Sequence, residues 1–133
     1  MEIISVATRS HSELVDITAE VQQLVTRSGI ASGLCLLYVP HTTAAVTINE
    51  SADPSVRADI KMMLDKLIPW QGGYSHLEGN SAAHIKSTLV GASEMVMVSE
   101  GRLVLGTWQG VFFCEFDGPR KRKLYVRLIP DVT

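Results

Sequence analysis

Three histidines are the residues of this 133-residue chain whose types and spacing are best suited to chemistry. His76 and His84 bracket the segment His-Leu-Glu-Gly-Asn-Ser-Ala-Ala-His, in which Asn80 is a predicted cap for the helix that follows. His84 would then lie in the first helical turn and His76 on the preceding loop, so their rings meet only if the loop folds back. His41 comes just after a predicted buried strand, a common place for functional side chains.

Three neutral imidazoles suit zinc or another divalent first-row metal that keeps an open position for water or a substrate oxygen. The spacing alone does not show that His41, His76 and His84 converge. The alternative is that each histidine is an ordinary polar residue, hydrogen-bonded where a helix or strand ends.

Two carboxylates accompany these histidines. Glu78 lies two residues after His76, and Glu50 lies at the exit of the strand that follows His41. Either carboxylate could orient a histidine or transfer a proton, so both are candidate catalytic residues. The alternative for Glu78 is a simple favourable interaction with the positive end of the helix dipole.

Several hydroxyl, amide and cationic side chains are suited to holding an anion such as phosphate. They are Thr42, Thr43, Asn80, Lys86, Arg120 and Arg122. On a strand, Arg120 and Arg122 would share one face while Lys121 and Lys123 share the other. The alternative for the lysines is an edge strand that is kept soluble by charge.

Trp108 and Gln109 lie near a predicted strand start. A tryptophan there is by default a core residue, and the sharper interpretation is stacking on a heteroaromatic ligand. Cys35 and Cys114 each lie within an apolar run, which predicts buried thiols rather than a disulfide or metal ligands.

The composition predicts a single soluble globular domain, because 46% of the residues are hydrophobic and 20% are charged. A formal net charge of -2 gives no overall attraction to nucleic acid or anionic membranes, and the short basic run at 120–123 lacks interleaved aromatic residues. No apolar stretch is long enough to span a bilayer, and the first residues do not resemble a signal peptide. We therefore expect a cytoplasmic protein that binds neither nucleic acid nor membranes.

Hydrophobic periodicity and turn residues predict about three helices and seven or eight strands. The expected strands are 2–7, 13–17, 33–39, 44–49, 93–99, 102–105, 107–116 and 121–129. The expected helices are 18–28, 54–68 and 81–90, with caps at Thr18, Asp53 and Asn80. An apolar stripe on the second helix, which includes Met63 and Leu67, is expected to be core. Irregular alternation of these elements predicts an α+β fold, a single-domain sandwich of mostly antiparallel strands.

Separated motifs in this chain closely resemble the YjbQ family, whose members are often called secondary thiamine-phosphate synthases. The motifs are His-Thr-Thr-Ala-Ala at 41–45, Asn-Glu-Ser-Ala-Asp-Pro at 49–54, the 76–84 segment, Gly-Thr-Trp-Gln-Gly at 106–110 and Glu-Phe-Asp-Gly-Pro-Arg at 115–120. The resemblance covers nearly the whole chain.

The resemblance implies a small α+β domain that assembles as a homotrimer, with zinc held by His41, His76 and His84. It also implies a pocket lined by further motif residues, namely Asn49, Glu50, Glu78, Asn80, Trp108, Gln109 and Arg120. The activity behind the family's common name joins a pyrimidine diphosphate to a thiazole phosphate, and magnesium could accompany the diphosphate.

The leading hypothesis is therefore a metal-dependent enzyme that acts on a small phosphorylated heterocycle, with weak thiamine-phosphate synthase activity. Glu78 or Glu50 would transfer a proton during the reaction. The alternative is a metal- or metabolite-binding module without turnover, for which we would expect a fully coordinated metal and a large loss of thermal stability when the metal is removed.

Overall fold

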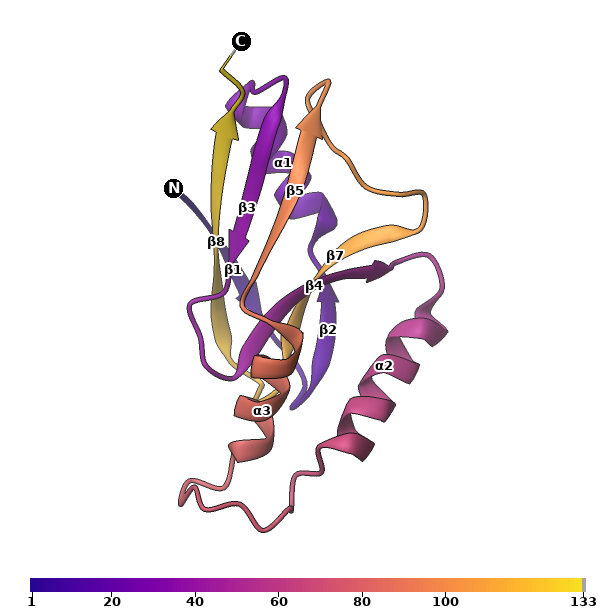
Figure 1. Cartoon of the computed structure of the whole chain (residues 1–133), viewed down its shortest axis with the longest axis vertical. Coiled ribbons are helices and arrows are strands. Elements are labelled where there is room, and N and C mark those ends of the chain that lie inside the picture. The colour runs from indigo at the N-terminus through magenta and orange to yellow at the C-terminus, as the bar shows by residue number, and fades with distance from the viewer. Residues whose placement is uncertain (133) are drawn as a thin grey trace.

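The structure is a computed structural model that describes residues 1–132 (Figure 1). The described residues form eight strands and three helices. The strands are β1 (Glu2–Ala7), β2 (Glu13–Asp16), β3 (Gly33–Tyr38), β4 (Ala44–Glu50), β5 (Ser93–Ser99), β6 (Arg102–Leu103), β7 (Gln109–Glu115) and β8 (Lys121–Pro130). The helices are α1 (Thr18–Ser28), α2 (Pro54–Leu67) and α3 (Ser81–Val90).

The strands form two antiparallel sheets, which confirms the predicted α+β sandwich. The larger sheet has the order β1-β8-β3-β5-β6, and the smaller has the order β2-β7-β4. The last strand, β8, therefore lies between β1 and β3. Strand β6 ends at Leu103, two residues before the predicted end.

Two apolar clusters flank the smaller sheet. The larger cluster fills the space between the sheets and includes Val21 of α1, Leu37 of β3 and Phe113 of β7. The second lies on the other face of β7, where Phe112 and Cys114 pack against α2 and α3. Alternate residues of β7 thus point into different cores, so the strand is buried on both faces. Cys35 and Cys114 are buried free thiols, as predicted.

The structure confirms only some of the helix caps that the sequence predicts. The Asp53 side chain accepts a hydrogen bond from the Ser55 N–H at 2.9 Å, and Pro54 takes the first helical position, as predicted. Asn80 occupies the predicted N-cap position of α3, but its side chain makes no cap hydrogen bond, because its amide group donates to Asp117 at 2.9 Å instead. The predicted Thr18 cap is wrong: Thr18 is the first residue of α1, and its hydroxyl accepts from the Val111 N–H.

The apolar stripe of α2 is less buried than predicted. Met63 is 45% exposed and Leu67 is 68% exposed, while Ile60 and Leu64 pack against the second cluster. The physical reason is the position of α2 at one side of the smaller sheet, where only part of its apolar face finds a partner (Figure 1). Among residues 1–132, no helix is both long and apolar enough to cross a membrane.

Candidate functional site: a histidine cleft

An open cleft of about 810 Å³ brings many of the expected site residues together. We call it the histidine cleft. It is lined by residues 38–43, which run from the end of β3 through the loop that leads to β4, and by His76, Glu78, Asn80, His84, Ala92, Arg120 and Arg122. His41, Thr42 and Thr43 thus line the same cleft as His76 and His84, although more than thirty residues separate the two segments in sequence.

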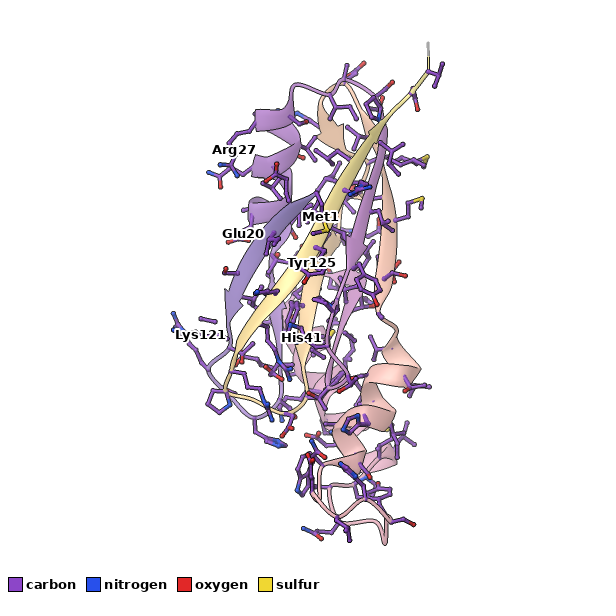
Figure 2. The ribbon with its side chains drawn as sticks, turned by 90° about the vertical axis from the view of Figure 1, so that its left-hand side faces the viewer. Met1, Glu20, Arg27, His41, Lys121 and Tyr125 are labelled. Atoms are coloured by element: carbon purple, nitrogen blue, oxygen red, sulfur yellow. The ribbon has the colours of Figure 1, made fainter. Side chains whose placement is uncertain are left out.

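His41 is held just beyond one end of the larger sheet, where β3 and β8 lie side by side. Its Nε2 accepts a hydrogen bond from the Lys123 N–H at 2.9 Å, beyond the point where β3 ends and stops pairing with β8. Figure 2 shows His41 below Tyr125 along the length of the molecule, toward the end that carries α3. Burial, followed by the nearby Arg122 charge, lowers the pKa of His41. The neutral ring that accepts at Nε2 carries its proton at Nδ1, so it can donate only from that atom.

His76 and His84 face one another across the loop that precedes α3. Their ring centroids are 5.5 Å apart and the rings are nearly perpendicular. The loop before α3 therefore folds back, which is the condition that the sequence analysis set for the two imidazoles to come together. Glu78 Oε2 lies 3.8 Å from His76 Nε2, within reach of an ion pair when the imidazole is protonated.

Asp117 positions two cleft residues at once. Its Oδ2 accepts from Asn80 Nδ2 and from Arg120 Nη2, each at 2.9 Å, and its carbonyl oxygen accepts from Arg120 Nε at 2.7 Å. Asp117 therefore ties the start of α3 to the start of β8. The Arg120 side chain is 53% exposed, so its remaining N–H groups are free to meet an anion.

Beneath the cleft, Arg122 forms a buried ion pair with Glu115. Its Nε donates to Glu115 Oε1 at 2.8 Å, and its Nη2 donates to the other carboxylate oxygen and to Thr43 Oγ1. Glu115 also accepts from the Thr8 hydroxyl at 2.7 Å. The pair joins β7 of one sheet to β8 of the other directly under the cleft.

The comparisons with known proteins agree over nearly the whole chain. The protein-family model described as "UPF0047 protein YjbQ-like" matches residues 2–131. The chain belongs to the YjbQ-like UPF0047 family. It is 49% identical to UPF0047 protein YugU of Bacillus subtilis over 130 residues, which cover 97% of this chain and 98% of YugU. It is 52% identical to the UPF0047 protein of Methanocaldococcus jannaschii over 126 residues, which cover 95% of this chain and 91% of that protein.

Solved structures of YjbQ-like proteins share the fold. A YjbQ/UPF0047 protein of Clostridium acetobutylicum superposes with a TM-score of 0.95 at 48% identity, over 97% of this chain and 100% of that chain. A YbjQ-like protein of unknown function from Sulfolobus solfataricus gives a TM-score of 0.93 at 38% identity, over 98% and 96% of the two chains.

Four of the expected site residues of this YjbQ-like chain lie outside the cleft, at the other end of the smaller sheet. They are Asn49, Glu50, Trp108 and Gln109. Glu50 ends β4, roughly 20 Å along the strand from Ala44, the residue next to the cleft. The side chains of this group make local contacts, since Gln109 Oε1 accepts from the Gly106 N–H at 2.8 Å and Glu50 Oε2 accepts from the Ala52 N–H.

Lys86 is also absent from the histidine cleft. It is buried on α3 and donates to Asp65 of α2, in a separate cavity. The spacing from His84 to Lys86 explains the difference, because residues two apart on a helix point in different directions.

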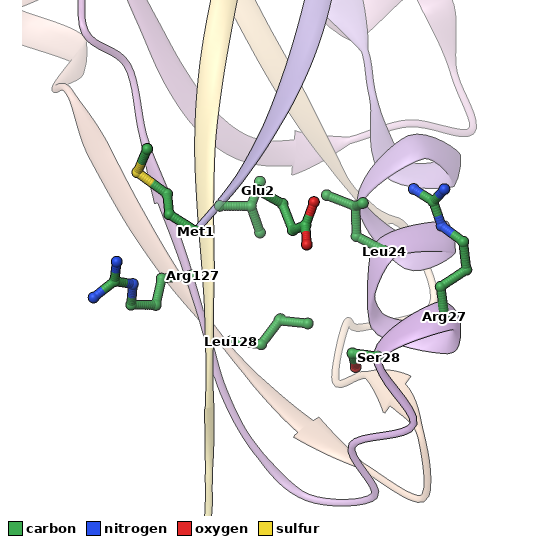
Figure 3. A pocket seen from close by; sticks show the side chains of 8 residues that line it. Met1, Glu2, Leu24, Arg27, Ser28, Arg127 and Leu128 are labelled. Atoms are coloured by element: carbon green, nitrogen blue, oxygen red, sulfur yellow. The ribbon is translucent and has the colours of Figure 1, made fainter.

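A further groove, between β8 and α1, contains none of the expected site residues. Figure 3 shows Glu2 directed toward α1 while Arg27 and Arg127 point away from the space between them. The groove therefore lacks the convergent cations of an anion site.

Sequence reasoning did not assign Glu115 or Asp117 to the site. A signal for Glu115 was available. On a strand, alternate side chains point to the same face, so Glu115 points to the buried face that also carries Val111 and Phe113. A carboxylate at such a position needs a buried partner. Arg122 can be that partner, because it points to the buried face of β8. Asp117 lies in a turn and carried no comparable signal.

Proposed function

We propose that this YjbQ-like protein is an enzyme that binds a small phosphorylated heterocycle in the histidine cleft. The observation that supports the proposal most directly is that three imidazoles and the free edge of the Arg120 guanidinium line one open cleft. Imidazoles supply acid–base groups that work near neutral pH, and a guanidinium binds phosphate oxygens.

The charges around the cleft require an additional cation for this function. Arg120 and Arg122 are each paired with a carboxylate, and Glu78 adds a further negative charge. The carboxylates thus outnumber the guanidinium groups, so a phosphate dianion needs more positive charge before it binds well. Protonated imidazoles or a divalent metal ion could supply that charge.

The fit of a metal to the described side chains is incomplete. His76 and His84 are suitable neighbours, but Nε2 of His41 is engaged by Lys123. Within residues 1–132, no three histidine, cysteine, aspartate or glutamate side chains are placed to hold one ion. Zinc on all three histidines stays a prediction, and it requires His41 to exchange its bond with Lys123.

Arg120, His41, Glu78 and His76 each have a role in this proposal that follows from their contacts. Arg120, fixed by Asp117, binds the phosphate group of the ligand. His41 stays neutral and donates from Nδ1. Glu78 lies 3.8 Å from His76 and orients it, and these two residues carry out proton transfer to or from the ligand.

Binding of inorganic diphosphate, measured by calorimetry with and without zinc, tests the anion site. We expect Arg120→Met to weaken binding by about tenfold or more, because a charge-assisted contact is lost. Lys121→Met is the matched control, since this exposed neighbour does not line the cleft and should not alter binding. Equal binding by both variants would contradict the proposed role of Arg120.

Elemental analysis tests the metal prediction. We expect about one divalent ion per chain in the wild type and loss of that ion in His76→Ala and His84→Ala. His41→Ala separates the two arrangements, because it loses the metal only if His41 becomes a ligand. If all three variants keep the wild-type metal content, the metal prediction is wrong.

Turnover distinguishes the enzyme from a binding module. The first reaction to assay is the joining of a pyrimidine diphosphate to a thiazole phosphate, which the sequence resemblance implied. We expect slow turnover that falls on chelation and in Glu78→Gln. Tight binding of the phosphorylated compounds without turnover would favour the binding module instead.

A further inference from the structure

A second cavity lies between α2, α3 and the loop that joins β1 to β2. It has a volume of about 630 Å³, within the range of small-molecule sites, and shares no lining residue with the histidine cleft. Its lining consists of residues 10–12, Lys61, Asp65, Trp70 and Lys86. We call it the Trp70 cavity.

Lys86 is a buried cation in the wall of this cavity. Its side chain is 5% exposed, and its ammonium group donates to Asp65 Oδ1 while lying 5.9 Å from the centroid of the Phe116 ring. An ammonium group has three N–H donors, and the hydrogen bond to Asp65 uses one. A buried charge is stabilised by every further acceptor that reaches it, so an anion in the cavity would be attracted to Lys86.

The charges of the lining favour a monoanion. Lys61 and Lys86 are positive, and Asp65, which contacts both, is negative. One positive charge is therefore left uncompensated. A carboxylate matches it, whereas a phosphate dianion would exceed it and meet the repulsion of Asp65. The hydroxyls of Ser10 and Ser12 are further donors for the carboxylate.

The rest of the wall suits a flat apolar group. Trp70 is half-buried and packs against the second apolar cluster, with its ring centroid 4.4 Å from that of His11 in an edge-to-face arrangement. An aromatic ring in the cavity could pack against the indole in an offset or edge-to-face arrangement.

We propose that the Trp70 cavity is a second ligand site, which binds a small aromatic carboxylate through Lys86 and Trp70. This site is separate from the histidine cleft, and its existence does not depend on the proposed enzymatic function. The carboxylate shares the Lys86 ammonium group with Asp65, and the aromatic ring lies against Trp70.

Titration with benzoate, followed by tryptophan fluorescence in full-length Trp108→Phe protein, tests the site. Trp70 is then the only tryptophan, because the chain contains two. We expect a saturable change in Trp70 emission. Neutral benzamide and inorganic phosphate should bind about tenfold more weakly or worse, since each lacks either the charge or the aromatic ring.

Variants at Lys86 and Asp65 identify the binding groups. Lys86→Met should weaken benzoate binding by about tenfold or more, and Lys66→Met, an exposed change on the same helix as Asp65, should leave it unaltered. Asp65→Asn should tighten binding several-fold, because it frees Lys86 from a competing carboxylate. A purely structural Lys86–Asp65 pair would not produce this gain.

Several outcomes would overturn the proposal. They are the absence of a saturable change with benzoate, equal binding of benzamide, and weaker binding in Asp65→Asn. Loss of benzoate binding in His76→Ala would also overturn it, by placing the ligand in the histidine cleft. If Lys86→Met does not fold, the benzamide and Asp65→Asn comparisons still decide, because both keep Lys86.

Discussion

Glu115 shows how a single charged residue can hold the cleft and the fold together. Burial alone would raise the pKa of its carboxyl group, but the hydrogen bond from Arg122 and further hydrogen bonds outweigh burial and lower that pKa. The carboxylate is fully buried, and Arg122 is nearly so. Each charge is tolerable in the interior only because the other is present.

We predict that Glu115→Gln lowers the free energy of unfolding by roughly 3–5 kcal/mol, because it leaves Arg122 buried without a countercharge. Urea unfolding measures the loss. The double variant Glu115→Leu/Arg122→Met removes both charges and should be more stable than Glu115→Gln. A double variant that is less stable than this single variant would contradict the explanation.

The same pair predicts a pH dependence. The folded-state pKa of Glu115 lies below its ordinary value of 4.5, so its contribution to stability is complete above that pH. The contribution is lost as the pH falls through the folded-state pKa. The stability difference between wild type and Glu115→Gln should therefore shrink between about pH 5 and pH 3. A difference that stays constant over this range would contradict the assignment.

At the scale of residues, the positions of the cleft histidines could be predicted from the sequence, but their hydrogen bonds could not. The strand end at His41 and the helix start near His84 are local signals, and both lie at the cleft. The bond from Lys123 to His41 depends on β8 lying beside β3, which no local pattern reveals. The same holds for Glu50 and Trp108, whose distance from the cleft follows from the direction of β4 and β7.

Helix α2 was predicted from strong local signals, yet it is the least buried helix. Asp53 and Pro54 fix its start, and α2 contains no fully buried residue, whereas α3 buries Ala82 and Ala83. The Asp53 cap could be predicted because it involves only neighbours in sequence. The exposure of Leu67 could not, because it depends on how far the smaller sheet extends beneath the helix.

We predict that the amides of α2 exchange with solvent faster than those of α3, because fewer buried contacts oppose local opening. Asp53→Ala should accelerate exchange in the first turn of α2 several-fold by removing the bond to the Ser55 N–H. Asp59→Ala, in the same helix but away from the cap, is the control. Hydrogen–deuterium exchange measures all three proteins, and equal acceleration by both variants would contradict the role of the cap.

For the whole molecule, the outer face of the larger sheet carries several exposed apolar side chains. Met97 of β5 is 61% exposed and pairs in register with Leu34 of β3, which also pairs with Ile129 of β8. Farther along the same face, Tyr38 stacks on Tyr125 with ring centroids 6.5 Å apart. An exposed surface of this kind commonly marks an interface.

The homotrimer implied by the sequence resemblance stays a prediction, and we expect this face to form its interface. Sedimentation should give three times the chain mass of 14.5 kDa for the wild type. Met97→Glu should dissociate the assembly, because it buries a charge without a partner. Ile85→Glu, at an exposed apolar position on α3, is the control. A wild type that sediments as a single chain would contradict the prediction.

The position of β8 between β1 and β3 also affects how the protein is made. Strand β8 is synthesised after every other strand of the larger sheet, and it pairs with residues 2–7 of β1. Until β8 leaves the ribosome, β1 and β3 have no shared partner, and their backbone groups remain open to pairing with other chains. The larger sheet is therefore completed only when β8 joins it, so this strand determines when the open edges of β1 and β3 are covered.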